Sequence, residues 1–141
     1  MRKFLRNTIG TLFLFTVIIC GVFLFVLLHA PAFEKGENYT FYLGANSSSP
    51  AIRSNNPVLD KLTLDVKGES TQYEGNRLEA LQKKYHAQLL FSEETCGVTS
   101  YYFYSPYFRS AVELNGYAVN LHIAVSEKKT VAGTPLIFGG F

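Results

Sequence analysis

The sequence has few cysteines, and this limits how the chain can be held together. It contains two, Cys20 within a long apolar run and Cys96 far beyond it. The part of the chain after the run therefore has a single cysteine and cannot form an internal disulfide. This excludes the small secreted domains that depend on disulfides. Residues 34–141, about 108 in number, can bury a workable core without one.

The sequence also lacks the spacings that mark metal sites and the motif of a serine hydrolase. Its three histidines, His29, His86 and His122, are far apart, and no His-x-His or Cys-x-x-Cys pair occurs. There is no G-x-S-x-G motif. Cys96 follows two glutamates, whose negative charge disfavours a reactive thiolate. We therefore expect no metal, no cofactor and no enzymatic activity.

An excess of basic residues is missing from the part of the chain that follows the apolar run. The formal net charge is +2, from 13 basic and 11 acidic residues. Three of the basic residues, Arg2, Lys3 and Arg6, precede the run, which leaves ten basic against eleven acidic residues after it. No basic stripe is left to neutralise a phosphate backbone, so nucleic acid is not an expected partner.

The apolar run itself, residues 8–28, carries no charged side chain. As a helix its 21 residues would be about 31 Å long, close to the thickness of bilayer hydrocarbon. It is longer than the apolar run of about 7 to 15 residues in a secretory signal peptide. Ala30-Pro31-Ala32 resembles a cleavage site, but the proline and the long run make cleavage doubtful. We expect an uncleaved signal-anchor helix, with a cleaved signal as the alternative.

The distribution of basic residues predicts the orientation of this helix. They precede it, whereas the segment after it is mixed and slightly acidic. Cytoplasmic flanks hold the excess of Lys and Arg, so the N-terminus is expected inside and the rest of the chain outside. The predicted organisation is a cytoplasmic basic head (1–7), a single transmembrane helix (8–28), a juxtamembrane segment (29–57) and an extracytoplasmic domain (58–141).

The juxtamembrane segment divides into two parts. Residues 38–43 alternate in a way that favours a short strand. Residues 44–57 are dense in Gly, Ser, Asn and Pro, which predicts a polar loop. That loop is interpreted as a flexible tether or, alternatively, as a loop that contacts a ligand.

The domain is predicted to be α+β, with one helix packed on a mainly antiparallel, meandering sheet. Residues 61–68 alternate as a half-buried strand, and 76–87 form a helix capped by Asn76. Four more strand-like runs follow, with hairpin turns at Thr95-Cys96-Gly97 and Asn115-Gly116. Gly133 and Pro135 interrupt the last run, 130–141, and indicate a sheet edge or a bulge.

The strand predicted at 117–125 has two unlike faces. Its period of two places five apolar residues on a buried face: Tyr117, Val119, Leu121, Ile123 and Val125. Asn120 and His122 lie on the other face, between Ala118 and Ala124. We expect that second face to be solvated or to line a shallow groove.

Residues 100–108 are rich in aromatic side chains, which fall on both faces of the predicted strand 98–105. Antiparallel pairing of this strand with 117–125 would place tyrosines beside His122. Exposed tyrosines are common at interfaces, so Tyr102, Tyr104, Asn120 and His122 form the candidate binding surface.

The layout of a basic head, one span and a small cysteine-poor external domain looks like that of many bacterial envelope proteins. The function we expect is a non-enzymatic binding or envelope-associated role, with a protein or glycan partner. The alternative is a small cell-envelope hydrolase that uses His122.

Overall fold

The structure is a computed structural model that describes residues 2–28, 30–44 and 46–139, with the backbone alone for residues 2–7. The side chains of the predicted basic head therefore lie outside the described residues. The chain divides into two units, Met1–Ala30 and Pro31–Phe141. The first unit is helix α1 (Arg2–Leu28), whose apolar stretch Thr8–Leu28 is long and apolar enough to cross a membrane and has none of its residues buried.

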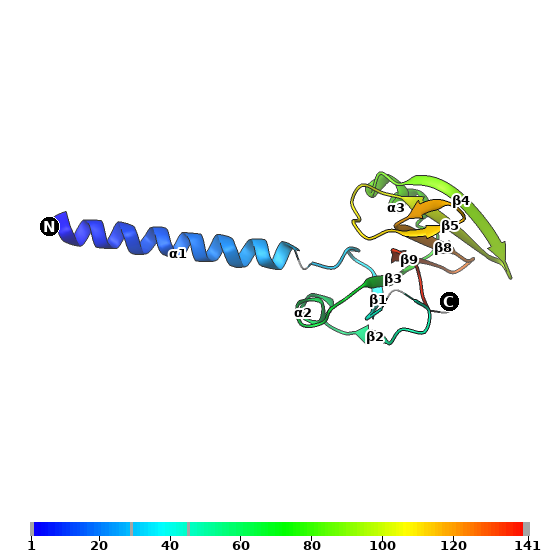
Figure 1. The fold of residues 1–141 in the computed structure, drawn as a ribbon, viewed down its shortest axis with the longest axis horizontal. Helices are drawn as coiled ribbons and strands as arrows, with labels where there is room; N and C mark the ends of the chain where they lie inside the picture. The colour runs from blue at the N-terminus through cyan, green and yellow to red at the C-terminus, as the bar shows by residue number, and fades with distance from the viewer. Residues whose placement is uncertain (1, 29, 45, 140–141) are drawn as a thin grey trace. The chain divides into compact units, whose positions relative to one another are not determined.

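The second unit has the predicted α+β architecture. Its main sheet has seven strands in the order β2-β1-β3-β9-β8-β5-β4, all paired antiparallel, and a separate hairpin is formed by β6 and β7 (Figure 1). The elements are β1 (Glu37–Tyr42), β2 (Ala51–Ser54), α2 (Pro57–Thr63), β3 (Gly68–Glu74), α3 (Leu78–Lys84), β4 (Gln88–Thr95), β5 (Val98–Tyr104), β6 (Val112–Leu114), β7 (Tyr117–Val119), β8 (Leu121–Val125) and β9 (Lys129–Thr134).

Helix α2 was not predicted, and it overlaps the start of the strand expected at 61–68. The side-chain oxygen of Asn56 accepts a hydrogen bond from the Leu59 amide at 3.3 Å, and Pro57 occupies the first helical turn. Both features start a helix. The alternation of leucines in this stretch indicated a strand, but the local cap determines the structure, and the strand begins only at Gly68.

The polar loop predicted at 44–57 is also partly wrong. Residues Ala51–Ser54 form strand β2, which pairs with β1 and makes one edge of the main sheet. Residues 31–57 therefore belong to the same compact unit as the rest of the domain, and the predicted boundary between 57 and 58 does not separate two parts.

Strand β9 lies in the interior of the sheet, where the sequence indicated an edge or a bulge. It pairs with β3 on one side and β8 on the other. Pro135 follows the last residue of the strand, so its missing N–H removes no hydrogen bond from the ladder. Because β3 pairs with β9 rather than with the next strand in the chain, the sheet is not a simple meander.

Both predicted hairpin turns are confirmed. Cys96 and Gly97 have φ values of 52° and 76°, and Asn115 and Gly116 have φ values of 52° and 77°. Two successive residues with positive φ match the twist of an antiparallel pair, and this favours a glycine at the second position. In the first hairpin Thr95 pairs with Val98, so the turn has two residues rather than three.

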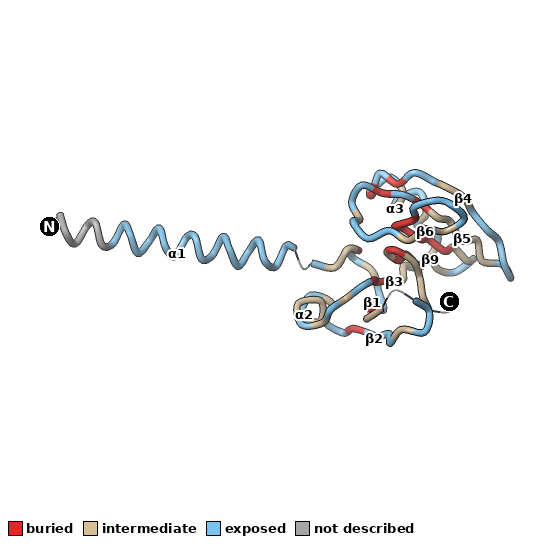
Figure 2. The backbone as a smooth tube through the Cα atoms, in the orientation of Figure 1, coloured by how far each residue is buried: buried red, intermediate tan, exposed pale blue. Residues whose placement is uncertain are grey.

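The helix predicted at 76–87 is present as the shorter α3, Leu78–Lys84, and its N-cap is Arg77 rather than the predicted Asn76. The Asn76 side chain accepts a hydrogen bond from the Leu78 amide at 3.0 Å, and Leu81 and Tyr85 are buried. They contribute to the hydrophobic core, and Figure 2 shows buried stretches of the chain in red, in strands of the sheet and near α3. The buried members of this core are Phe33, Leu81, Tyr85, Ala87, Phe103, Leu121, Ile123 and Ala132.

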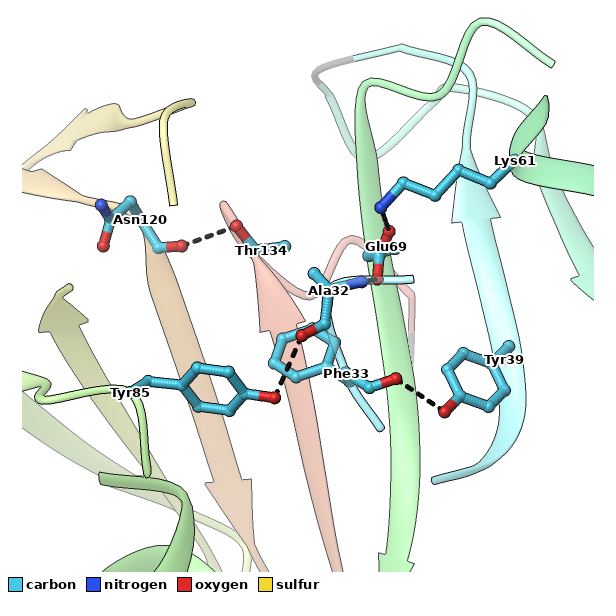
Figure 3. A network of polar contacts seen from close by, with 8 residues as sticks. All are labelled: Ala32, Phe33, Tyr39, Lys61, Glu69, Tyr85, Asn120 and Thr134. Carbon is cyan, nitrogen blue, oxygen red and sulfur yellow. Dashed lines mark hydrogen bonds and ion pairs between the residues drawn. The ribbon is translucent and has the colours of Figure 1, made fainter. Parts of the chain in front are cut away.

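The segment that begins at Pro31 is held within the domain by its own backbone. The Ala32 amide donates to the buried carboxylate of Glu69, and the Tyr85 hydroxyl donates to the Ala32 carbonyl at 3.0 Å (Figure 3). The Tyr39 hydroxyl donates to the Phe33 carbonyl at 2.7 Å, and the Phe33 side chain is 1% exposed. These residues are therefore part of the fold and not a loose linker.

Candidate functional site

The strand predicted at 117–125 is divided into two strands at Asn120. β7 pairs with β6 in the small hairpin, whereas β8 lies between β5 and β9 in the main sheet. Of the predicted buried face, Val119, Leu121 and Ile123 are fully buried. Tyr117 is 47% exposed, because it belongs to the hairpin and not to the main sheet.

Asn120 is buried, with 1% of its surface exposed. The prediction of a solvated position is therefore wrong for this residue. Its side-chain oxygen accepts from the Ser105 amide at 2.7 Å, and its side-chain nitrogen donates to the carbonyls of Ser105 (2.7 Å) and Phe108 (2.8 Å). These three bonds satisfy backbone groups of the chain that leaves β5. The side chain therefore has a structural role at the junction of β7 and β8.

The bonds around Asn120 extend to other elements. The Ser105 hydroxyl donates to the Tyr85 carbonyl at 2.6 Å, just after α3. The Thr134 hydroxyl, at the end of β9, donates to the Asn120 carbonyl at 2.8 Å (Figure 3). Asn120 thus helps to join β5, β8, β9 and α3, and its polar atoms are not available to a ligand.

His122 lies beside a tyrosine, as predicted from the pairing of the two strands. It is directly opposite Tyr102, and the ring centroids are 4.5 Å apart with 18° between the planes. On its other side His122 is opposite Gly133 of β9. The side chain is 7% exposed, so the predicted solvated face is wrong for this residue as well.

The chain after β9 explains why His122 is covered. The Ile137 amide donates to Nδ1 of His122 at 3.3 Å. A Cβ added at Gly133 would lie 2.7 Å from the Ile137 side chain, so glycine leaves the room that Ile137 needs over the sheet. The alternation of residues within one strand does not show that His122 is covered, because the covering residue, Ile137, lies in a later segment of the chain.

The contacts of His122 leave one of its nitrogens without a partner. Since Nδ1 accepts a hydrogen bond, the proton of the neutral ring is on Nε2, which is buried and has no hydrogen-bond partner among the described residues. Burial lowers the pKa of His122 from 6.5 to about 4. The imidazole is therefore neutral near pH 7.

These contacts give no support to a hydrolase centred on His122. A general base needs a nucleophile or an orienting carboxylate within hydrogen-bond distance. In the described part of the chain, neither ring nitrogen bonds a serine, a cysteine or a carboxylate. No group of three His, Cys, Asp or Glu side chains among the described residues is placed to hold a metal ion.

The aromatic side chains near His122 remain accessible in part. Phe91 stacks on Tyr102, with ring centroids 4.4 Å apart, and lies 5.9 Å from the Tyr117 ring. Tyr104 and Tyr117 are 45% and 47% exposed, and Tyr102 and Phe91 are half-buried. We name Phe91, Tyr102, Tyr104 and Tyr117 the aromatic surface.

Half of the aromatic surface was predicted from the sequence. Tyr102 and Tyr104 were predicted, whereas Phe91 and Tyr117 were missed. Phe91 reaches Tyr102 through the β4–β5 register, which contains an irregularity between Leu89 and Phe91. The predicted hairpin indicated that these two strands pair, but the alternation of residues in a strand does not show which residues lie opposite each other.

Comparisons of the chain with protein-family models, curated proteins and solved structures found no match.

Proposed function

We propose that the protein is a single-pass membrane protein with its N-terminus in the cytoplasm and residues 31–141 outside the membrane. The observation that carries this proposal is the apolar stretch Thr8–Leu28, none of which is buried by the rest of the protein. A surface of this kind is stable in lipid and not in water. The basic residues that precede it support the orientation.

The fold of the domain favours retention of the helix over its removal. Cleavage after Ala32 would create a charged amino group on Phe33, which is 1% exposed. It would also remove the two hydrogen bonds of the Ala32 backbone to Glu69 and Tyr85. Burying a charge without a partner is costly, so a cleaved domain would be less stable than the anchored one.

The orientation can be tested with the cysteines of the natural sequence. Cys96 is exposed in a turn of the domain, and Cys20 lies within the apolar stretch. We expect a membrane-impermeant maleimide to label intact cells that carry the wild-type protein, and Cys96→Ser to abolish the labelling. Labelling that occurs only after lysis would contradict the proposed orientation.

We further propose that the domain acts without catalysis, by binding a protein or glycan of the cell envelope through the aromatic surface. Tyrosine combines a large apolar ring with a polar hydroxyl, which suits both kinds of partner. Two observations support this: Phe91 stacks on Tyr102 and lies 5.9 Å from the exposed Tyr117, and the exposed Tyr104 is two positions after Tyr102 on β5, hence on the same face.

Photocrosslinking tests this surface in the native membrane. A photoreactive residue at position 104 or 117 should give adducts, and mass spectrometry should identify them as peptide or sugar. Tyr107 is the matched control, because it is 59% exposed but contacts Tyr85 and His86 instead. The proposed surface is wrong if position 107 gives the same adducts as 104 and 117.

A further inference from the structure

A second surface of the domain forms a polar groove across four strands. It has a volume of about 510 Å³ and is lined by side chains from β1, β2, β3 and β9 and from the segment after β9. Directly opposite residues on neighbouring strands lie on the same face of a sheet. One such row crosses the sheet from Arg53 through Thr40, Ser70 and Gly133 to His122, so this groove lies on the sheet face that also carries His122. We name it the β1–β3–β9 groove.

The groove contains two basic side chains that form no ion pair with a described residue. Arg53 comes from the edge strand β2, and Lys129 comes from β9. None of the described residues that line the groove is Asp or Glu. Glu74 is opposite Lys129 in the ladder, but no ion pair joins them, and Arg53 has none within the described chain. The groove is therefore positively charged, although the external unit as a whole is not.

The polar side chains between these cations have hydrogen-bonding capacity left for a ligand. Ser70 shares a hydrogen bond of 2.9 Å with the Tyr42 hydroxyl. The side chains of Asn38, Thr40 and Gln72 make no hydrogen bond to any described residue. Amide and hydroxyl groups both donate and accept, which matches the hydroxyl groups of a sugar.

We propose that the β1–β3–β9 groove binds an acidic glycan, a carbohydrate chain that carries carboxylate or phosphate groups. This proposal rests on the proposed extracytoplasmic binding role and names the ligand class. The Arg53 guanidinium can bind either anion through two parallel hydrogen bonds. Strands β2 and β9 are three strand spacings apart, about 14 Å. An extended ligand with more than one acidic group therefore suits the groove better than one small anion.

Binding is tested on the full chain in lipid nanodiscs by isothermal titration calorimetry. The probes are an oligogalacturonate, a glycerol phosphate oligomer and a neutral malto-oligosaccharide of similar length. We expect at least one acidic probe to bind, and the identity of that probe tells carboxylate from phosphate. Binding should weaken as salt is raised, since salt screens exposed charges. The neutral probe should bind at least tenfold more weakly, about the effect of one lost charged hydrogen bond.

A matched pair of double variants assigns the binding to the groove. The variant Arg53→Gln with Lys129→Gln should weaken binding of the acidic probe about tenfold or more. The control, Arg109→Gln with Lys83→Gln, removes the same charges from exposed positions that do not line the groove and should bind as the wild type does. Thermal unfolding of each variant checks that the fold is kept, and Gln72→Ala provides a second groove variant without a charge change.

Three results would overturn the groove as the site. They are no binding of either acidic probe to the wild type, equal binding of the neutral probe, and equal loss in the two double variants. Loss of binding in Tyr104→Ser with Tyr117→Ser, but not in the groove variant, would place the ligand on the aromatic surface. That result would overturn this inference and leave the proposed binding role intact, so the two failures are distinguishable.

Discussion

Asn120 and His122 are two positions apart and both are buried, yet their polar atoms have opposite environments. Every hydrogen-bonding group of the Asn120 side chain that the structure describes has a partner within 2.8 Å. His122 has one bond of 3.3 Å, from the Ile137 amide, and its other nitrogen has no partner among the described residues. The same short motif therefore contains a satisfied polar group and an unsatisfied one.

This difference shows what each residue contributes to the fold. The Asn120 side chain bonds backbone groups of Ser105 and Phe108 in the segment that leaves β5, so it stabilises the fold at any pH at which the fold exists. His122 is tolerated in the interior only as a neutral ring, because burial of the charged form without a partner is unfavourable. Its contribution should therefore depend on pH.

Replacing the satisfied residue should have the largest effect on stability. Asn120→Ala leaves the Ser105 amide and the Phe108 carbonyl without their partner, whereas the Ser105 carbonyl keeps a bond of 3.4 Å from the Phe108 amide. Each unsatisfied buried group costs about 1 to 3 kcal/mol, so we expect a loss of about 3 to 5 kcal/mol. Chemical denaturation of the full chain measures this loss.

The matched control for Asn120 is Asn55, which is exposed and has no described side-chain hydrogen bond. Asn55→Ala should change the free energy of unfolding by less than about 0.5 kcal/mol. Equal effects of the two substitutions would show that the Asn120 bonds do not stabilise the domain.

The unsatisfied residue should make stability depend on pH. The folded pKa of His122 is about 4, below the ordinary 6.5, so the unfolded chain binds a proton first as the pH falls. The contribution of His122 is complete above about pH 6.5 and is lost as the pH falls to about 4. The loss is about 3 kcal/mol. Denaturation at several pH values should show this decline in the wild type but not in His122→Gln, and parallel pH profiles would contradict it.

The loss of a single hydrogen bond should have a smaller effect on stability, and it gives a reference for the predicted effects at Asn120 and His122. Tyr85→Phe removes the bond from the Tyr85 hydroxyl to the Ala32 carbonyl and keeps the ring. We expect a loss of about 1 kcal/mol, roughly a third of the effect of Asn120→Ala. A loss as large as that of Asn120→Ala would mean that the number of hydrogen bonds lost does not determine the loss of stability.

The exposed tyrosines should have the smallest effect on stability. Tyr104→Ser and Tyr117→Ser change side chains that are 45% and 47% exposed, so each should alter the free energy of unfolding by less than about 0.5 kcal/mol. If either substitution costs as much as Asn120→Ala, the aromatic surface is structural and not a binding surface.

Local signals in the sequence were sufficient for much of the fold. The Asn115-Gly116 turn, the helix that follows Asn76 and the apolar residues Leu121 and Ile123 are each recognisable within a few residues of sequence. The structure confirms the turn, the helix and these buried positions, because turn geometry and amphipathic periodicity depend on neighbours in the chain.

The candidate site could not be predicted to the same extent, because it depends on distant segments. The cover over His122 comes from Ile137, and the partners of Asn120 come from Ser105 and Phe108. A polar residue in a strand gives the same sequence pattern whether such a cover is present or not. Helix α2 was missed for the opposite reason, since the local cap at Asn56 was present and the strand-like alternation was given more weight.

The titration of His122 tests most directly the claim that it lies in the interior and not on a functional surface. NMR of the imidazole in the full chain, with His122→Gln to assign the signal, gives its pKa. We expect a neutral ring near pH 7 and a pKa of about 4. A pKa near 6.5 would mean that His122 is solvated, and it would contradict the burial that leaves His122 out of the aromatic surface although its ring stacks on Tyr102.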